Sequence, residues 1–293
     1  MKTKTKQKIM QSSLIKIILG LLICFAAFIL AQQLTGKLLD FFSINKDFRN
    51  LIRGVVASFA VLLAYKSFYQ KIEKRDVVEL SGNGSLKNIS LGILIGTVLQ
   101  CLTILVICIF GDFQITSVNS FYSLITPFSI AFSVAIFEEI LLRGIIFRIT
   151  EEKLGSYVSL ILSGVIFGAV HLMNPSSTLL SSLCIGLVGI IFGASYIYSK
   201  SLWLPIAIHF SWNFMQSGVF GAVTSGNEKT NSLFNTTISG PDVITGGAFG
   251  PEGTIQATLL WLLVSIILMI VITKQNKLVK KNWNRAKGLR LQS

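Results

Sequence analysis

The stretch Phe132-Ser-Val-Ala-Ile-Phe-Glu-Glu-Ile-Leu-Leu-Arg-Gly-Ile-Ile-Phe147 places three ionisable side chains inside an apolar run. Glu138 and Glu139 are adjacent, and Arg143 follows four residues after Glu139. In a membrane helix each such group costs about 2.5–3.5 kcal/mol at the bilayer centre if it faces lipid. Ionisable residues in this position are usually there for function, so the stretch predicts both a membrane helix and a functional site.

The composition of the whole chain supports the membrane assignment. Of its 293 residues 52% are hydrophobic and 13% are charged, and the mean hydropathy is +0.69. These values are too apolar for an ordinary soluble domain. Because a hydrocarbon core about 30 Å thick takes roughly 20 apolar residues per helix, we expect an all-α polytopic fold with about eight transmembrane helices. The expected spans are Leu14–Ala31, Leu51–Phe68, Ile89–Phe110, Phe121–Phe147, Tyr157–His171, Leu179–Tyr198, Leu202–Val223 and Thr254–Thr273.

Lysine and arginine are distributed unevenly between the alternate ends of these spans. With the N-terminus inside, the inner segments hold eighteen of the 26 basic residues, the outer segments hold four, and the spans hold the remaining four. Cytoplasmic loops carry such an excess, so we expect both termini in the cytoplasm. Short loops and richness in Lys, Asn and Ile indicate a bacterial plasma membrane. The net charge of +13 is then explained by anionic headgroups, and no nucleic-acid partner is expected.

Changes in composition divide the chain into four parts. Residues 1–120 hold the first transmembrane helices and a polar cytoplasmic loop with a flexible Gly/Ser centre, and residues 121–223 hold the polar motifs. Residues 224–253 form a Gly-rich extracytoplasmic loop, and residues 254–293 hold the last helix and a basic cytoplasmic tail. Loops as long as 224–253 are commonly functional or disordered. We expect disorder there, with a lid or a docking surface as the alternatives.

Helical spacing decides which polar groups share a face. Glu139 and Arg143 are four residues apart, so they can form an ion pair. Glu138 is rotated by about 100° from Glu139 and needs another partner, which leaves it available for chemistry. The plainer interpretation is a buried polar clamp between helices, although an unpaired carboxylate is a costly clamp.

The chain has two histidines, and both lie in expected spans. His171 ends the fifth span, and His209 lies in the seventh, four residues before Asn213, so one helix presents an imidazole and an amide on the same face. A single histidine in an apolar helix is more often a hydrogen-bonded packing residue. Two of two within spans, accompanied by two glutamates, favour a functional cluster instead.

Distances along the helices test whether these groups can meet. Glu138 and His171 each lie about 16 residues, or roughly 25 Å, from a turn near residues 154–155, so they would stand at the same level. His209 lies only nine residues past Lys200, or roughly 13 Å along a helix. Either the fourth and fifth helices project beyond the membrane on the cytoplasmic side, or the seventh helix begins within it. In the first case the polar groups would meet in the cytoplasmic half of the bilayer.

Three motifs follow one another along these spans, Glu138-Glu139-x-x-x-Arg143, Phe167-x-x-x-His171 and His209-x-x-x-Asn213. Together they resemble the CPBP family, which comprises the type II CAAX prenyl endopeptidases and bacterial relatives also called Abi or lysostaphin-resistance-protein-A-like proteins. The resemblance covers roughly residues 121–223, about a third of the chain. We therefore expect this part to form a catalytic core similar to that of the family.

The resemblance implies an α-helical intramembrane endopeptidase whose active-site cavity lies within the helix bundle and opens towards the cytoplasm. By position, the family's roles fall on Glu138 as general base with His171 beside it, on His209 and Asn213 as oxyanion donors, and on Glu139 with Arg143 as support. The expected partners are the lipid bilayer and a membrane-associated protein or peptide substrate.

The residues leave open whether a metal takes part. Glu138, His171 and His209 offer three donors that zinc accepts, with a fourth position for water. The chain has no His-Glu-x-x-His helix, and Asn213 is a poor zinc ligand but a good oxyanion donor. We therefore favour a metal-free glutamate mechanism, with a zinc metalloprotease as the alternative.

Two other classes of function use the same residues. A non-catalytic membrane scaffold or regulator of a signalling or cell-envelope protein would keep the fold, but it would gain stability by replacing Glu138. A proton-coupled transporter would use the carboxylates and histidines as a relay. Such carriers normally have helices broken by Gly or Pro in matching halves, and this sequence shows no internal repeat.

Overall fold

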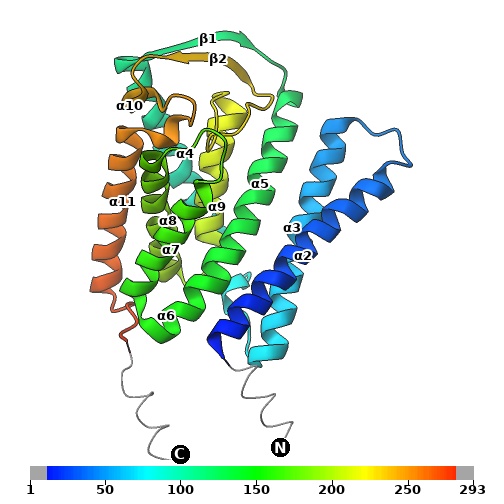
Figure 1. Ribbon diagram of the computed structural model, residues 1–293, viewed down its shortest axis with the longest axis vertical. Helices are drawn as coiled ribbons and strands as arrows, with labels where there is room; N and C mark the ends of the chain where they lie inside the picture. The colour runs from blue at the N-terminus through cyan, green and yellow to red at the C-terminus, as the bar shows by residue number, and fades with distance from the viewer. Residues whose placement is uncertain (1–11, 282–293) are drawn as a thin grey trace, which may run out of the picture.

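The computed structural model describes residues 12–281, and most of these residues are helical. Long helices run alternately up and down in one bundle (Figure 1). The helices are α2 (Ser13–Leu39), α3 (Lys46–Glu73), α4 (Ser85–Phe110), α5 (Ile125–Glu139), α6 (Arg148–Leu154), α7 (Ser156–His171), α8 (Leu179–Ser199), α9 (Trp203–Asn213), α10 (Asp242–Thr245) and α11 (Ile255–Lys274). The basic residues expected at positions 2–8 and in the tail beyond 281 lie outside the described residues.

Five of the described helices are long and apolar enough to cross a membrane, namely α2, α3, α4, α8 and α11. Large apolar side chains on their outer faces are exposed, among them Leu22 at 61%, Leu94 at 60% and Leu263 at 55%. Contiguous apolar surface of this kind is unfavourable in water. The exterior of the bundle therefore fits an integral membrane protein.

The prediction of about eight spans is not confirmed. The span expected at Phe121–Phe147 is divided into α5 and a π-helical segment, η3 (Ile140–Phe147). The span expected at Leu202–Val223 is divided into α9 and a second π-helical segment, η4 (Phe214–Val219). The fifth expected span is α7, whose 16 residues fall short of the roughly 20 that cross the core. Apolar composition alone does not distinguish a continuous α-helix from a rod with π-helical turns.

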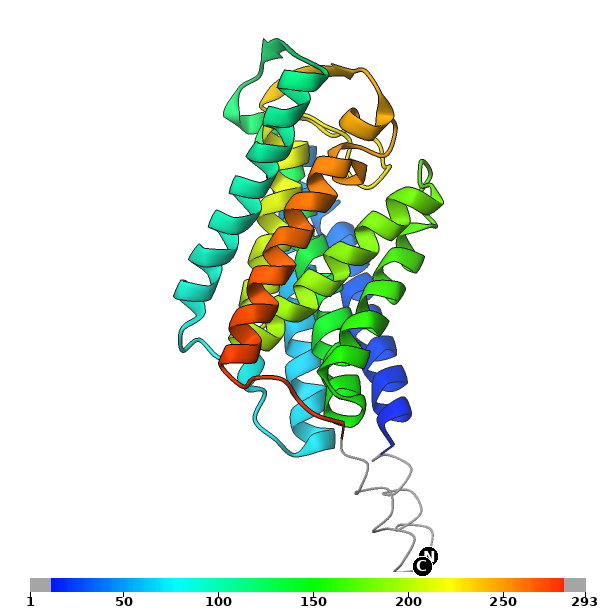
Figure 2. The ribbon, with the colours of Figure 1, turned by 90° about the vertical axis from the view of Figure 1, so that its left-hand side faces the viewer.

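The connections between helices lie at two opposite ends of the bundle. At the end that holds both described chain ends, called the termini end below, lie the α3–α4, α6–α7 and α8–α9 connections (Figures 1 and 2). At the opposite end, called the sheet end, lie β1 (Asp112–Val118), β2 (Phe234–Ser239) and α10 (Figure 1). The bundle therefore has two ends of different construction.

Strands β1 and β2 form an antiparallel two-stranded sheet, which the all-α prediction missed. Asp112 pairs with Ser239, and Val118 pairs with Phe234. Strand β2 belongs to segment 224–253, where we expected disorder. This segment instead folds into β2, α10 and a 3₁₀ turn, η5 (Pro251–Gly253), so that prediction was wrong. Each strand receives its hydrogen-bond partner from a segment far along the chain, which a local sequence pattern does not reveal.

Helices α4 and α9 lie in close contact because glycine occupies their interface. A Cβ added to Gly96 would lie 2.1 Å from Oγ of Ser211 and 2.5 Å from the carbonyl oxygen of Ile208. Gly92, one turn earlier, would place a Cβ 2.8 Å from the carbonyl oxygen of Leu204. Only a residue without a side chain allows the two backbones to approach this closely. The contact fixes the position of the helix that carries both His209 and Asn213.

The polar loop between α3 and α4 is docked onto the bundle rather than flexible. Glu79 is 1% exposed and accepts hydrogen bonds from Arg75 (Nη2 to Oε1, 2.7 Å) and from the hydroxyl of Tyr65. Burial alone would raise the pKa of Glu79, but these hydrogen bonds outweigh it and hold the pKa below its usual value. The backbone N–H of Leu202 donates to the Glu79 carbonyl oxygen at 2.9 Å, so the loop also holds the segment that enters α9.

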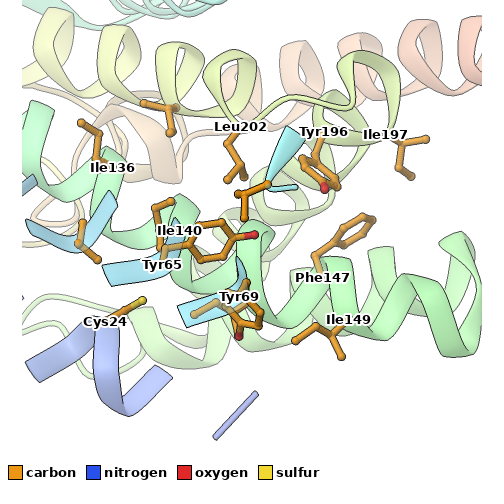
Figure 3. Packing of buried hydrophobic residues seen from close by; sticks show 14 of the residues in the cluster. Cys24, Tyr65, Tyr69, Ile136, Ile140, Phe147, Ile149, Tyr196, Ile197 and Leu202 are labelled. Carbon is orange, nitrogen blue, oxygen red and sulfur yellow. The ribbon is translucent and has the colours of Figure 1, made fainter. Parts of the chain in front are cut away.

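Tyr65 belongs to a buried apolar cluster that packs α3 against η3 and against the α8–α9 connection (Figure 3). Ile140, Phe147 and Leu202 are members of the same cluster, and none of these side chains is exposed. The cluster fills the space between these elements on the side of the termini end.

Replacing Gly96 with alanine should force α4 away from α9 and destabilise the fold. The added Cβ would meet a backbone carbonyl, which moves only if α9 moves. Over-packing of this kind typically costs about 1–3 kcal/mol, so the thermal unfolding midpoint of the detergent-purified variant should fall by several degrees. Gly82→Ala is the matched control, because nothing lies within 4 Å of its added Cβ. Equal midpoints for the two variants would contradict a close α4–α9 contact.

Candidate active site

Two of the three predicted site segments lie where a regular helix gives way to π-helical turns. Helix α5 ends at Glu139, and η3 continues the same rod and contains Arg143. Helix α9 ends at Asn213 and continues as η4. Single π-helical turns within α-helices are frequent at functional sites. Here one such segment directly follows each of two predicted site segments.

Glu139 and Arg143 form the ion pair that their spacing predicts. Nη1 of Arg143 lies 2.8 Å from Oε1 of Glu139, and both side chains are fully buried. Nη2 of Arg143 donates to the carbonyl oxygen of Gly189 on α8 at 2.9 Å. The guanidinium also lies 4.7 Å from the ring centre of Phe167 and 4.9 Å from that of Phe192. A buried guanidinium with these contacts is held in one position.

His209 is oriented by the same carboxylate. Its Nδ1 lies 3.1 Å from Oε1 of Glu139, and its ring stacks on Phe192 with centroids 5.0 Å apart. A carboxylate paired with arginine only accepts hydrogen bonds, so Nδ1 of His209 is the donor. Nε2 of the ring then points towards Glu138, whose Oε2 is 4.0 Å away.

His171 is oriented in a similar way by the backbone. Its Nδ1 donates to the carbonyl oxygen of Phe167 at 2.8 Å, one turn earlier on α7. The ring also contacts Phe167, with centroids 4.5 Å apart. In both histidines Nδ1 therefore donates a hydrogen bond to an oxygen of the protein. This orientation leaves Nε2 of each ring available to accept from a ligand or to donate to it.

One cavity brings four of the predicted residues together. Its volume is about 360 Å³, and Glu138, His171, His209 and Asn213 line it. Glu139 and Arg143 lie behind this wall and are not among its lining residues. The other lining residues are Ile130, Ala131, Val134, Val170, Asn174, Ser217, Ala222, Thr224, Ser225, Asn227, Glu228 and Thr230. The three motifs thus supply one cavity and the support behind it.

Glu138 differs from its neighbour Glu139 in exposure and in partners. The Glu138 side chain is 27% exposed, whereas that of Glu139 is not exposed at all. Oε2 of Glu138 is buried and has no hydrogen-bond partner among residues 12–281. A buried acceptor without a partner is costly, which suits an oxygen reserved for a ligand. Because Nε2 of His209 is 4.0 Å away, a water about 2.8 Å from both atoms would fit.

His209 reaches the same depth in the bundle as Glu138 because of where the α8–α9 connection lies. A Cβ added to Gly144 would lie 3.4 Å from Cδ1 of Leu202, so this connection stands beside η3. His209 is seven residues past Leu202, and Glu138 is six residues before Gly144, or roughly 9–10 Å in each case. The rods α5–α6 and α7 therefore extend further towards the termini end than α8 and α9 do.

The cavity opens at the sheet end of the bundle. Asn174 from the α7–α8 connection and Thr224, Asn227 and Thr230 from segment 224–253 line its mouth. Both described chain ends lie at the opposite end (Figures 1 and 2). The cavity mouth and the described chain ends therefore lie at opposite ends of the bundle. A cavity open to the cytoplasm and cytoplasmic termini, which we expected together, cannot both be right.

A buried carboxylate that the sequence did not reveal anchors this mouth. Glu252 of η5 is 4% exposed and accepts a hydrogen bond from the backbone N–H of Ser225, whose carbonyl oxygen accepts one from Nδ2 of Asn174 at 2.8 Å. Burial raises the pKa of Glu252 above its usual value, against the opposing effects of Ser225 and of nearby His171. With His171 it lines a second, small cavity of about 20 Å³. No helical spacing connects Glu252 to the motifs, so the sequence carried no signal for it.

The donors at the cavity fit zinc in type. Each imidazole has Nδ1 hydrogen-bonded to an oxygen, as metal-binding histidines usually do, and Glu138 supplies a carboxylate. Within residues 12–281, however, no three His, Cys, Asp or Glu side chains are grouped so that they could hold a metal ion. The chemistry of the donors fits the metal, and their present grouping does not.

Residues 120–215 match the family model described as "Type II CAAX prenyl endopeptidase Rce1-like". This match confirms the resemblance predicted from the three motifs, all of which it contains, and the family is a protease family. It covers about a third of the chain. No curated protein and no solved structure matches the chain.

Arg143→Met should destabilise the protein strongly, because it leaves the Glu139 carboxylate buried without its ion pair. Breaking a buried pair in this way costs about 3–5 kcal/mol, which thermal unfolding in detergent should detect. Arg49→Met is the matched control, since its partner Asp40 is 55% exposed and such pairs contribute about 0–1 kcal/mol. Adding Glu139→Gln to Arg143→Met should recover part of the loss. A single variant no less stable than Arg49→Met would argue against the support that we assign to Arg143.

Glu252→Ala should loosen segment 224–253, because it removes the acceptor of the Ser225 N–H. We expect limited proteolysis of the detergent-purified variant to cut within this segment faster than in the wild type. Glu228→Ala serves as the control, since this exposed side chain lies in the same segment. Identical cleavage rates for both variants would mean that Glu252 does not anchor the segment.

Proposed function

We propose that the chain is an intramembrane endopeptidase of the CPBP type, which hydrolyses a peptide bond of a membrane-associated protein or peptide. The observation that carries this proposal is the buried Oε2 of Glu138, which has no hydrogen-bond partner within residues 12–281 and lies with two oriented imidazoles in one cavity. The match of residues 120–215 to a protease family supports the same reaction class.

In the proposed reaction Glu138 acts as general base. Its carboxylate accepts a proton from a water molecule, and the water oxygen attacks the carbonyl carbon of the scissile peptide bond. The proton then passes to the leaving nitrogen, so the products are a carboxylate and an amine. His171 keeps Nδ1 on the Phe167 carbonyl, and its Nε2 accepts a second hydrogen bond from the same water. Such base catalysis typically contributes about 10²–10⁴-fold.

His209 and Asn213 donate hydrogen bonds to the oxyanion of the tetrahedral intermediate. In this role His209 donates from Nε2 while Nδ1 stays on Glu139, so both ring nitrogens carry a proton. Asn213, one turn further along the rod, contributes its side-chain amide. Donors fixed in a water-poor site stabilise developing charge strongly, and the loss of one typically costs about 10²–10³ in rate.

Glu139 and Arg143 position this site without touching the substrate. Glu139 accepts from Arg143 and from His209 through the same oxygen, and Arg143 is itself fixed to α8. The orientation of the His209 ring therefore depends on a pair that lies behind the cavity wall.

A zinc ion held by Glu138, His171 and His209 is the alternative to the metal-free reaction. Such an ion, when bound, would supply a water that is deprotonated near neutral pH. The residue roles of Asn213 and of the Glu139–Arg143 pair are the same in both cases.

Glu138→Gln should lower cleavage of a reporter-peptide library by detergent-purified protein by about 10²–10⁴-fold, because the amide cannot accept the proton. Asn213→Ala should lower it by about 10²–10³-fold. Glu152→Gln is the matched control, since that carboxylate is 60% exposed at the termini end and should leave activity unchanged. Thermal unfolding of each variant separates loss of chemistry from loss of fold.

Each purified enzyme is assayed with and without a zinc chelator. Activity that persists in chelator and disappears in Glu138→Gln supports the glutamate mechanism, whereas loss on chelation with rescue by zinc would establish the metal. If the folded wild type cleaves no peptide and cells that express Glu138→Gln keep the wild-type phenotype, a non-catalytic scaffold is favoured.

A further inference from the structure

We infer that the cavity opens on the extracytoplasmic side of the membrane and receives a peptide segment exposed there. Two independent observations carry the orientation, namely the position of the cavity mouth and the distribution of charge between the two ends of the bundle. The identity of the occupant rests on the proposed function, whereas the orientation does not.

The mouth lies at the sheet end. Its lining comes from the α7–α8 connection, through Asn174, and from segment 224–253, through Thr224, Asn227, Glu228 and Thr230. In both views β2 and the rest of this segment cap the end of the bundle that faces away from the described chain ends (Figures 1 and 2). A peptide enters the cavity most directly past these residues.

Between the site and the termini end the bundle is closely packed. Arg143 lies behind Glu139, and Ile140, Tyr65 and Leu202 pack beyond it, all with no exposed surface. The docked α3–α4 loop, held by Glu79, covers this cluster from the termini end. A peptide arriving from the termini end would have to displace a close-packed core and a buried ion-pair network.

Charge then assigns the two ends to the two sides of the membrane. The connections at the sheet end carry four basic residues and six acidic ones: Lys37, Lys46, Arg49 and Lys229, against Asp40, Asp47, Asp112, Glu228, Asp242 and Glu252. Within residues 12–281 the segments at the termini end carry eleven basic residues and five acidic ones. Because the excess of lysine and arginine marks the cytoplasmic side, the termini end is cytoplasmic and the cavity opens outwards.

The lining of the cavity indicates which segment of a substrate fits. The mouth is polar, whereas Ile130 and Val134 of α5 and Val170 of α7 form an apolar wall. A chain that leaves the bilayer and enters water presents the same change from apolar to polar. The occupant is therefore the extracytoplasmic juxtamembrane segment of a membrane-anchored polypeptide, and a cytoplasmic tail does not reach the site.

Cysteine labelling in intact protoplasts tests the orientation without any assay of activity. Asn227→Cys places a thiol at the mouth, and Asn83→Cys places one in the exposed α3–α4 loop at the termini end. The wild type is the blank, because its four cysteines lie within α2, α4 and α8. We expect a membrane-impermeant maleimide to label Asn227→Cys but to leave Asn83→Cys at the level of the blank. Both should be labelled after permeabilisation, and the reverse pattern in intact protoplasts would overturn the orientation.

A pair of reporters then tests the occupant. One cleavable segment is tethered to a membrane anchor on the outer face, and the same segment is tethered on the inner face, in cells that express either wild type or Glu138→Gln. Cleavage of the outer reporter alone, lost in Glu138→Gln, supports the inference, and cleavage of the inner reporter alone would overturn it. If labelling places the mouth outside and neither reporter is cut, the proposed endopeptidase function fails while the orientation stands.

Discussion

The carboxylate of Glu139 is the contact on which the site depends. One of its oxygens accepts from Arg143 and from His209, and Arg143 in turn binds the backbone of α8 at Gly189. Three rods thus meet at one fully buried negative charge. Since an uncompensated charge in such surroundings costs several kcal/mol, a shift of any of these rods that breaks one of these hydrogen bonds is unfavourable. Rigidity at Glu139 leaves Glu138, its neighbour in sequence, free to face the cavity.

Local periodicity was sufficient to predict which groups share a face. The four-residue spacings of Glu139 with Arg143 and of His209 with Asn213 are properties of a single helix, so no knowledge of the fold was needed. It was harder to predict that Glu138, His171 and His209, which lie on different helices, would stand at the same depth in the bundle. Counting from the turns left two explanations for His209, because the level of the α8–α9 connection is set by packing of Leu202 beside Gly144. The depth of His209 therefore follows from a contact between segments far apart in the sequence, and helical spacing alone does not give it.

The parts that sequence did not predict are all built from such distant contacts. The β1–β2 sheet joins two segments on either side of residues 120–215, which match the family model, and Glu252 reaches Ser225 across a stretch rich in glycine. Composition indicated disorder there because glycine and polar residues bury little apolar area by themselves. The bundle supplies the missing surface, and the segment becomes the wall of the cavity mouth. The mostly helical fold was thus predictable, whereas the β1–β2 sheet, the number of spans and the end of the bundle at which the cavity opens were not.

The π-helical segments η3 and η4 have a further consequence for how such membrane helices change in evolution. A π-helical turn accommodates a residue more than an α-helical turn, so the two halves of each rod are out of phase with an ideal helix. Losing one residue from η3 would leave its hydropathy nearly unchanged and would restore a regular helix. It would also rotate the half that carries Glu138 and Glu139 by about 100° relative to the half that follows. Single-residue deletions that are silent in a hydropathy plot would therefore dismantle the site.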